Sequence, residues 1–185
     1  MIITLTGVPG SGKTTAAKAL SAALGVPWYS IGDLRGKMAQ ERGLTIDQLN
    51  ALGEKEAFTD RDIDDYQAKI GERGEDCIVE GRLSWHFIPS SFKVFLDADP
   101  AVAGERIYRA QLTHRRTDEP VYGSAKEAAD TMAARVASDV RRYQKYYGVD
   151  FHDHANYDLV IDTTRVPPEE TAARILEAVR RKAGA

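Results

Sequence analysis

A glycine-rich octapeptide near the amino terminus constrains the fold more than any other part of the sequence. Residues 7–14 read Gly-Val-Pro-Gly-Ser-Gly-Lys-Thr and match the pattern G-x-x-x-x-G-K-[ST]. Glycines permit a tight loop whose backbone N–H groups point at phosphate oxygens, and a following helix adds its positive amino terminus. Residues 2–6 are rich in β-formers, and Ala16, Leu20 and Leu24 make one apolar helical face. The sequence therefore predicts a strand, a phosphate-binding loop and a helix.

The rest of the chain repeats this alternation of short strands and helices. Five apolar runs have the β-branched and aromatic content of strands: residues 2–6, 28–31, 77–80, 92–97 and 159–162. Helical patterns lie between them, which favours a parallel sheet covered by helices on both faces. The 185 residues suffice for one α/β domain and are too few for two full domains. We expect a single domain over residues 1–185 with a five-stranded parallel sheet.

Two segments exceed what the connections of such a sheet require. About 45 residues separate the second and third predicted strands, more than a simple crossover needs. They contain a capping box, Thr45 and Gln48, and apolar residues at helical spacing, so we predict a helical insertion over residues 32–75. Residues 111–123 are polar and partly basic and are predicted to form a short lid. A second capping box, Ser124 and Glu127, opens a long amphipathic helix.

Charge and hydropathy exclude several kinds of partner. The chain has 25 basic and 28 acidic residues and a formal net charge of −3, which argues against a broad surface for DNA or RNA. No apolar run approaches the roughly 18 residues of a membrane span, and the first residues lack the basic region of a signal peptide. The single cysteine, Cys77, cannot form an intrachain disulfide. We expect a cytoplasmic monomer that binds small molecules, with no nucleic-acid or membrane partner.

Several classes of protein bind nucleotides through a loop of this kind. A GTPase switch needs an N-K-x-D-type motif to read the base, and no Lys-x-Asp occurs in the chain. An assembly ATPase usually carries an extra helical domain, for which the chain is too short. A kinase that joins two phosphate-bearing ligands gathers negative charge in one cleft, where positioning and neutralisation supply most of the catalysis. Arginines near the predicted sheet edges and lid favour this class: Arg35, Arg82, Arg106, Arg109, Arg115, Arg116, Arg135 and Arg142.

The end of the third predicted strand carries a candidate metal ligand. Glu80 stands there, beside the strand that leads into the loop, and can hold Mg²⁺ directly or through water together with the Thr14 hydroxyl. Arg82 follows closely and can make a bidentate contact to phosphate. Lys13 is expected to reach the β- and γ-phosphates. Asp97 also ends a strand, but its position suits a helix-capping turn at least as well, so Glu80 ranks above it.

These motifs in this order resemble the nucleoside monophosphate kinases, and most closely the compact, archaeal-type cytidylate kinases. The resemblance covers nearly the whole chain. Its landmarks after the loop are Ser-Ile-Gly-Asp-Leu-Arg at 30–35, Glu-Gly-Arg at 80–82, Phe-Leu-Asp-Ala at 95–98, Glu-Arg at 105–106, the stretch 135–143, and Tyr-Gly-Val-Asp at 147–150. It implies a three-layer P-loop NTPase fold with a helical acceptor-binding insertion and a short lid. Residues 111–123 depart from the family, because they are longer and more basic than the lid of compact cytidylate kinases.

The resemblance also implies roles for individual residues. Arg35 and Arg82 would grip the acceptor phosphate, and Asp33 would lie near the acceptor's sugar or phosphate. The full acceptor set is Asp33, Arg35, Arg82, Arg135 and Asp139. The ATP-binding set is Gly7, Pro9, Gly10, Ser11, Gly12, Lys13, Thr14, Thr15 and the lid arginines Arg106, Arg115 and Arg116. The residues expected to act on the transferred group are Lys13, Arg82, Arg106 and Arg135, with Thr14 and Glu80 as the Mg²⁺ ligands.

The activity that the resemblance implies is transfer of the γ-phosphoryl group of ATP to CMP or dCMP by direct in-line displacement, with Mg²⁺ required. Adenylate, thymidylate and shikimate kinases share the scaffold, so another small acceptor is the alternative. A non-catalytic ATP-binding module is a second alternative. None of the motifs identifies the base. The charged stretch 54–65 is interpreted as a solvated helix face, with Arg61 or Asp62 as the alternative reader of the acceptor base.

Overall fold

The computed structural model describes residues 1–56, 58–113 and 120–184. Its strands are β1 (Ile2–Gly7), β2 (Trp28–Ser30), β3 (Cys77–Glu80), β4 (Phe92–Asp97) and β5 (Leu159–Asp162). All pair in parallel, in the order β2-β3-β1-β4-β5. This confirms the predicted α/β fold with a five-stranded parallel sheet.

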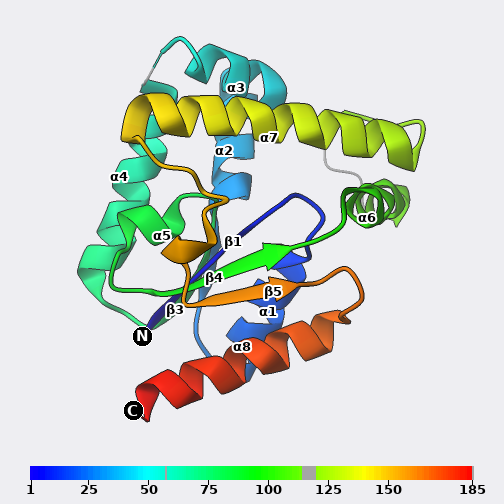
Figure 1. Cartoon of the computed structure of the whole chain (residues 1–185). Coiled ribbons are helices and arrows are strands. Elements are labelled where there is room, and N and C mark those ends of the chain that lie inside the picture. Colours follow the sequence, from blue (N-terminus) through cyan, green and yellow to red (C-terminus); the bar gives the residue numbers. More distant parts are fainter. Residues whose placement is uncertain (57, 114–119, 185) are drawn as a thin grey trace.

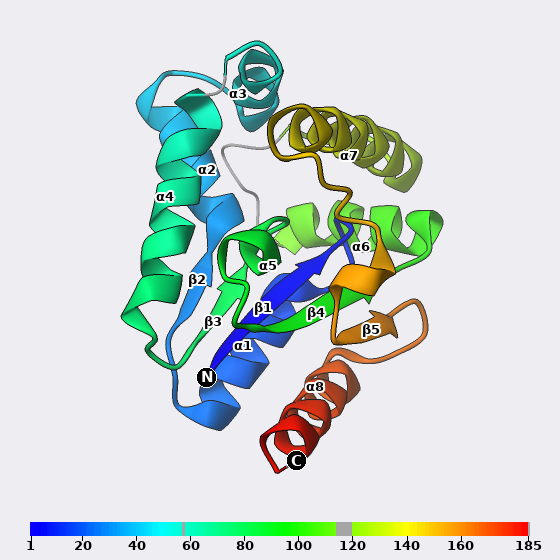
Figure 2. The same ribbon diagram turned by 60° about the vertical axis from the view of Figure 1, so that its left-hand side comes forward.

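Helices connect the strands. They are α1 (Lys13–Leu24), α2 (Ile31–Glu41), α3 (Ile46–Gly53), α4 (Phe58–Arg73), α5 (Ser84–Phe87), α6 (Pro100–Thr113), α7 (Ala125–Tyr147), the 3₁₀ turn η1 (His154–Asn156) and α8 (Pro168–Ala183). The sheet lies between α1 and α8 on one side and α4, α5 and α7 on the other (Figures 1 and 2). No helix in the described ranges is long and apolar enough to cross a membrane.

The central strand β1 shows why the sheet is covered on both faces. All six of its residues are buried, and its side chains alternate between two cores. Ile3 and Leu5 pack with Leu20 of α1 and Ile175 of α8, whereas Ile2 packs on the opposite face with the helices of the insertion. Full burial of one such aliphatic side chain contributes about 1.5–3 kcal/mol. This core fixes β1, and with it the loop that follows.

The predicted second strand ends one residue too late. Ile31 was expected to close it, but Ile31 is the first residue of α2. Ser30 caps that helix, because its side-chain oxygen accepts a hydrogen bond from the Asp33 backbone N–H at 3.2 Å. Ile31 is instead buried under the insertion helices.

Helices α2, α3 and α4 fill the long connection between β2 and β3. The capping box at the start of α3 is present: Thr45 Oγ1 accepts from the Gln48 N–H at 3.2 Å, and Gln48 Oε1 accepts from the Thr45 N–H at 2.8 Å. Leu49 and Met38 are buried together with Ile63 of α4. The segment 32–75 therefore consists of helices that pack as a unit, and its binding of the acceptor stays a prediction.

The start of the long helix α7 differs slightly from the predicted capping box. Ser124 accepts from the Glu127 N–H at 3.1 Å, as expected. The Glu127 side chain, however, accepts from the N–H of Gly123 at 2.7 Å, one residue before the N-cap. It therefore closes the turn just outside the helix.

The two ends of the segment 111–123, the predicted lid, are held together. Gln111, in the last turn of α6, donates to the Tyr122 carbonyl at 2.7 Å and accepts from the Tyr122 N–H at 2.9 Å. Tyr122 is buried beside Met132 of α7. Arg115 and Arg116 lie outside the described residues. The lid function of the segment stays a prediction.

Candidate active site

The loop between β1 and α1 depends on its glycines. Gly10 and Gly12 have φ angles of 76° and 86°, in the left-handed region that favours glycine. A Cβ atom on Gly10 would lie 2.6 Å from the Ala103 carbonyl oxygen on α6. A Cβ atom on Gly12, which caps α1, would meet no described atom within 4 Å. The open side of the loop therefore has room for a ligand to approach the backbone, as a phosphate would.

Lys13 folds back over this loop. Its Nζ donates to the carbonyl oxygens of Gly7 and Val8 at 3.0 and 2.7 Å. Burial lowers the pKa of Lys13 to about 8; the Glu80 carboxylate opposes this shift, and Arg82 adds to it. A partly buried ammonium beside neutral carbonyl groups is stabilised by an anion, so the loop is suited to receive phosphate.

Thr14 and Glu80 meet beside the loop. The Thr14 hydroxyl donates to Glu80 Oε1 at 2.8 Å. The register of β1 and β3 pairs Leu5 with Glu80, which brings the carboxylate to the edge of the sheet where the loop begins. A hydroxyl and a carboxylate are hard oxygen ligands of the kind that Mg²⁺ prefers. The residues present therefore fit a magnesium ion at this position.

A cavity of about 660 Å³ opens on one side of the loop. Its described lining comes from loop residues 10–15, from Glu80, from α6 and from residues 163–168 with Thr171. Arg106 of α6 connects these parts. It donates to the Gly10 carbonyl at 3.3 Å and to the Thr163 carbonyl at 2.7 Å. Arg106 thus lies at the predicted donor site, but in this state it holds the loop to the segment after β5.

A second cavity, of about 260 Å³, opens on the other side of the same loop. Its described lining is Pro9, Gly10, Lys13, Thr14, Ile31, Gly32, Arg35, Ile46, Asn50, Glu80, Gly81, Arg82, Ile107, Met132, Arg135, Asp139 and Tyr143. Gly10, Lys13, Thr14, Glu80 and Ile107 line both cavities. The two cavities therefore share one wall, which contains the loop lysine and the candidate magnesium ligands.

A chain of buried charges runs behind the second cavity. Arg35 donates to Asp60 at 2.9 Å, and Asp60 also accepts from Arg142 at 2.5 Å. Arg142 pairs in turn with Asp139, which also pairs with Arg82. Arg142 is only 1% exposed, so α2, α4, α7 and the end of β3 are connected through a network that water hardly reaches.

This network has an excess of positive charge. Three arginines, Arg35, Arg82 and Arg142, share two aspartates, so their positive charges repel one another. Burial is the main cause that lowers the pKa of Arg82 to about 10, and Arg135, Arg142 and Arg35 lower it further. Burial and Arg142 likewise lower the pKa of Arg35. An anion in the second cavity would relieve this repulsion, so the site is suited to a phosphate-bearing ligand.

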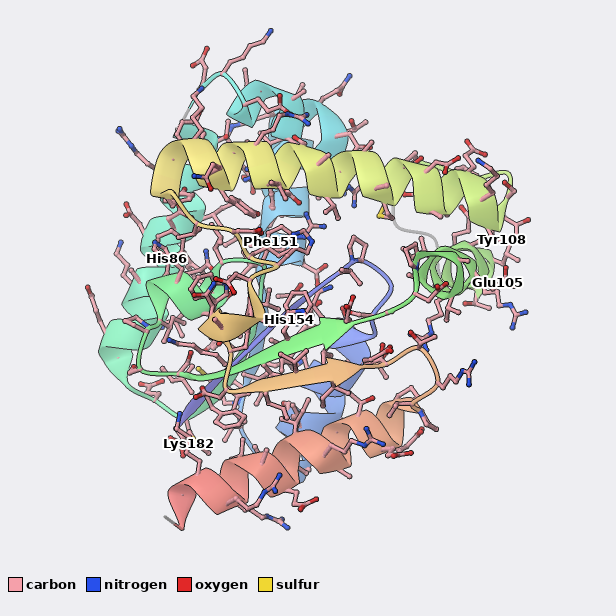
Figure 3. All side chains as sticks on the ribbon, viewed as in Figure 1. His86, Glu105, Tyr108, Phe151, His154 and Lys182 are labelled. Carbon is pink, nitrogen blue, oxygen red and sulfur yellow. The ribbon has the colours of Figure 1, made fainter. Side chains whose placement is uncertain are left out.

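Arg82 also rests on an aromatic side chain. Its guanidinium carbon lies 5.7 Å from the centre of the Phe151 ring. Phe151 is fully buried, and Figure 3 shows it below α7, between that helix and the sheet. The Arg82 carbonyl accepts from the indole N–H of Trp85 at 3.1 Å. The Phe151 ring and Asp139 contact the guanidinium itself, and the Trp85 indole holds the backbone of Arg82.

Most of the predicted site residues come together around the two cavities, and some do not. Gly7 lies under the loop, where a Cβ atom would approach the Leu96 carbonyl oxygen to 2.0 Å, and it lines neither cavity. Asp33 is exposed in the first turn of α2 and lies outside the described lining of both. Arg135 lines the second cavity and pairs with Asp47 of α3 at 3.1 Å.

Several site residues escaped prediction from the sequence. The stretch 54–65 was interpreted as solvated, but Asp60 is 5% exposed and belongs to the charge network. Arg61 and Asp62, the alternative readers of the base, are exposed. Asn50 was also missed. Its position in the middle of α3, where asparagine is a poor helix former, was the available signal.

The chain matches known proteins over most of its length. The model of the Cytidylate kinase-like family matches residues 2–165. A cytidylate kinase of Methanothrix thermoacetophila is 38% identical over 180 residues, which cover 97% of this chain and 98% of the relative. A cytidylate kinase of Methanocella arvoryzae is 35% identical and covers 97% of both chains.

Solved structures support the fold alone. A shikimate kinase from Bacteroides thetaiotaomicron superposes with a TM-score of 0.65 at 19% identity and covers 97% of this chain and 98% of its own. A shikimate kinase from Aquifex aeolicus gives a TM-score of 0.59 at 22% identity, covering 99% and 98%. These identities are too low to transfer a substrate.

Proposed function

Because the chain belongs to the cytidylate kinase-like family, we propose that it transfers the γ-phosphoryl group of ATP to CMP or dCMP. The products are ADP and CDP or dCDP. The observation that carries this proposal is the wall shared by the two cavities, formed by Gly10, Lys13, Thr14, Glu80 and Ile107. Ligands on either side of that wall would meet at the loop lysine.

The larger cavity receives ATP. Its phosphates occupy the loop, where the backbone N–H groups and the amino terminus of α1 neutralise charge. Lys13 moves from the Gly7 and Val8 carbonyls to the β- and γ-phosphates. Thr14 and Glu80 hold Mg²⁺, which neutralises charge on the phosphates when bound. The size of this cavity, about 660 Å³, supports a nucleoside triphosphate as its ligand.

The smaller cavity receives the acceptor, with its phosphate held by Arg35 and Arg82. An oxygen of that phosphate attacks the γ-phosphorus, the bond to the β,γ-bridging oxygen breaks, and ADP leaves with the electron pair. The acceptor oxygen is already anionic near neutral pH, so no general base is needed. Arg82, Arg106 and Arg135 stabilise the charge of the transition state.

The remaining roles belong to the same proposal. Asp139 orients Arg82, and Asp33, in the exposed first turn of α2, lies near the sugar or phosphate of the acceptor. Residues 32–75 bind the acceptor, and residues 111–123, with Arg115 and Arg116, close over ATP. A monomer is part of the same proposal. A cytoplasmic location fits the need for ATP.

A coupled ADP-release assay tests the proposal. Purified protein, ATP and Mg²⁺ are combined in turn with CMP, dCMP, UMP, AMP, dTMP and shikimate. We expect turnover with CMP or dCMP that exceeds turnover with every other acceptor. Turnover with shikimate and with no nucleotide would show that the acceptor is not a nucleoside monophosphate. ADP release at the same rate with and without an acceptor would indicate an ATPase.

A further inference from the structure

The acceptor cavity has two chemically different ends. Lys13, Thr14 and Glu80 lie on the wall shared with the larger cavity. Helix α3 of the insertion lines the cavity with Ile46, a buried apolar side chain, and with Asn50. Phosphoryl transfer requires the acceptor phosphate at the shared wall, so the nucleoside must extend toward the insertion.

Asn50 is the neutral polar side chain at the insertion end, on the same helix as Ile46. It lines the cavity and is 5% exposed. Its Oδ1 accepts from Arg35 Nε at 2.7 Å. Arg35 is itself fixed by its bond to Asp60. This contact determines which way the amide faces: the oxygen is turned to Arg35, and the Nδ2 group is the part left for a ligand.

The bond from Arg35 occupies Oδ1, and no described residue is seen to accept from the Nδ2 group, so Nδ2 can still donate to a ligand. Its two N–H groups can only donate. Cytosine presents two adjacent acceptors, N3 and O2. Uracil has the same shape and the same O2, but carries a donor, N3–H, in place of the N3 acceptor.

We propose that Asn50 is the residue that selects cytosine over uracil, by donating from Nδ2 to N3 of the base. The proposal rests on the proposed function, because it requires a pyrimidine nucleotide in the acceptor cavity. Arg35 acts twice in this arrangement: it grips the phosphate and locks the amide in the orientation that uracil N3–H cannot match. A site built to hydrogen-bond one group discriminates strongly against an analogue that cannot form the bond.

The first test replaces the donor with an acceptor of the same shape. Asn50→Asp keeps an oxygen for Arg35 and turns a second oxygen to the base. The added negative charge weakens binding of every nucleotide, so the readout is the ratio of kcat/KM for CMP to that for UMP. We expect this ratio to fall by about 100-fold or more. The matched control is Asn156→Asp in η1, outside the cavity lining, which should leave the ratio unchanged.

The second test changes the substrate, so it does not depend on the stability of one variant. 3-Deaza-CMP has a C–H in place of N3 and lacks that acceptor. The wild-type protein should use it about tenfold or more less efficiently than CMP, and Asn50→Ala should reduce this difference to near unity. An unchanged CMP-to-UMP ratio in Asn50→Asp, or an equal analogue penalty in wild type and Asn50→Ala, overturns the assignment while the CMP kinase function stands. A wild-type protein that phosphorylates neither CMP nor dCMP overturns both.

Discussion

Replacing Arg142 should destabilise the protein far more than replacing its neighbour Arg141. Both residues lie on α7, and each pairs with a carboxylate. Arg142 is 1% exposed and bridges Asp60 and Asp139, whereas Arg141 is 60% exposed and pairs with Glu54. Arg142→Met and Arg141→Met therefore make the same chemical change in a buried network and on the surface.

The size of the stability loss depends on which ion-pair partners each carboxylate keeps after the substitution. Breaking a buried ion pair costs about 3–5 kcal/mol when a charge is left without a partner. In Arg142→Met, Asp60 keeps Arg35 and Asp139 keeps Arg82, so we expect a somewhat smaller loss, about 2–4 kcal/mol. A protein of this size loses roughly 3 °C of Tm per kcal/mol, which gives a fall of about 6–12 °C. The surface pair of Arg141 contributes about 0.2–1 kcal/mol, or at most about 3 °C.

Differential scanning calorimetry measures the two Tm values, and steady-state kinetics measures the two Michaelis constants. Arg142→Met should also raise the KM for CMP, because Asp60 and Asp139 no longer hold Arg35 and Arg82 in one geometry. The KM for ATP should change little, since none of these residues lines the larger cavity. Equal Tm shifts in both variants, or an unchanged KM for CMP, would refute this account of the network.

Three further predictions concern the loop. Lys13→Met should reduce kcat by orders of magnitude with an unchanged circular dichroism spectrum, and retained turnover would exclude the loop lysine from catalysis. Because the pKa of Lys13 is about 8 in the free protein and phosphate favours the protonated form, ATP affinity should fall as pH rises through about 8. Calorimetry in two buffers of different ionisation enthalpy should then show proton uptake on ATP binding, and none in Lys13→Met. Gly10→Ala should raise the KM for ATP at least severalfold, because the new methyl group would lie 2.6 Å from the Ala103 carbonyl at a φ of 76°; a normal KM would contradict the tight loop.

The pKa of Lys13 also affects the free energy of unfolding. Because folding lowers this pKa, the stability of the free protein rises with pH. The folded protein loses the Lys13 proton near pH 8, whereas an unfolded chain keeps it to about pH 10.4. Burial of the charged form therefore destabilises the free protein below pH 8. This cost is relieved as pH rises from about 8 toward 10.4. ATP should reverse the trend, because it stabilises the charged form.

Local patterns predicted the strands, the loop and the insertion helices. The central strands β1, β3 and β4 are apolar runs that are mostly buried, whereas the edge strands β2 and β5 are partly exposed. Two predicted strand ends were wrong by one residue: the first strand continues to Gly7, and the second ends at Ser30. The capping residues Thr45 and Gln48 are three positions apart, so their mutual contact is visible in the sequence. Such features depend on neighbours along the chain.

The charge network could not be predicted in the same way. Asp60 lies in an acidic stretch that looks solvated, and its partners Arg35 and Arg142 are 25 and 82 residues away. Its burial therefore depends on how α2, α4 and α7 pack, which no local pattern encodes. The order of the strands, which brings Glu80 beside Thr14, is equally a property of the fold. The orientation of Asn50 depends in turn on Arg35, one helix away.

The most direct test of the central claim follows the transferred group. The protein is incubated with Mg²⁺, CMP and ATP labelled at the γ-phosphorus, and the products are separated. If ATP and CMP meet across the shared wall, the label should appear in the β-phosphate of CDP, in amounts equal to the ADP formed. Little label should appear in inorganic phosphate. Label released as inorganic phosphate at the same rate with and without CMP would contradict the claim.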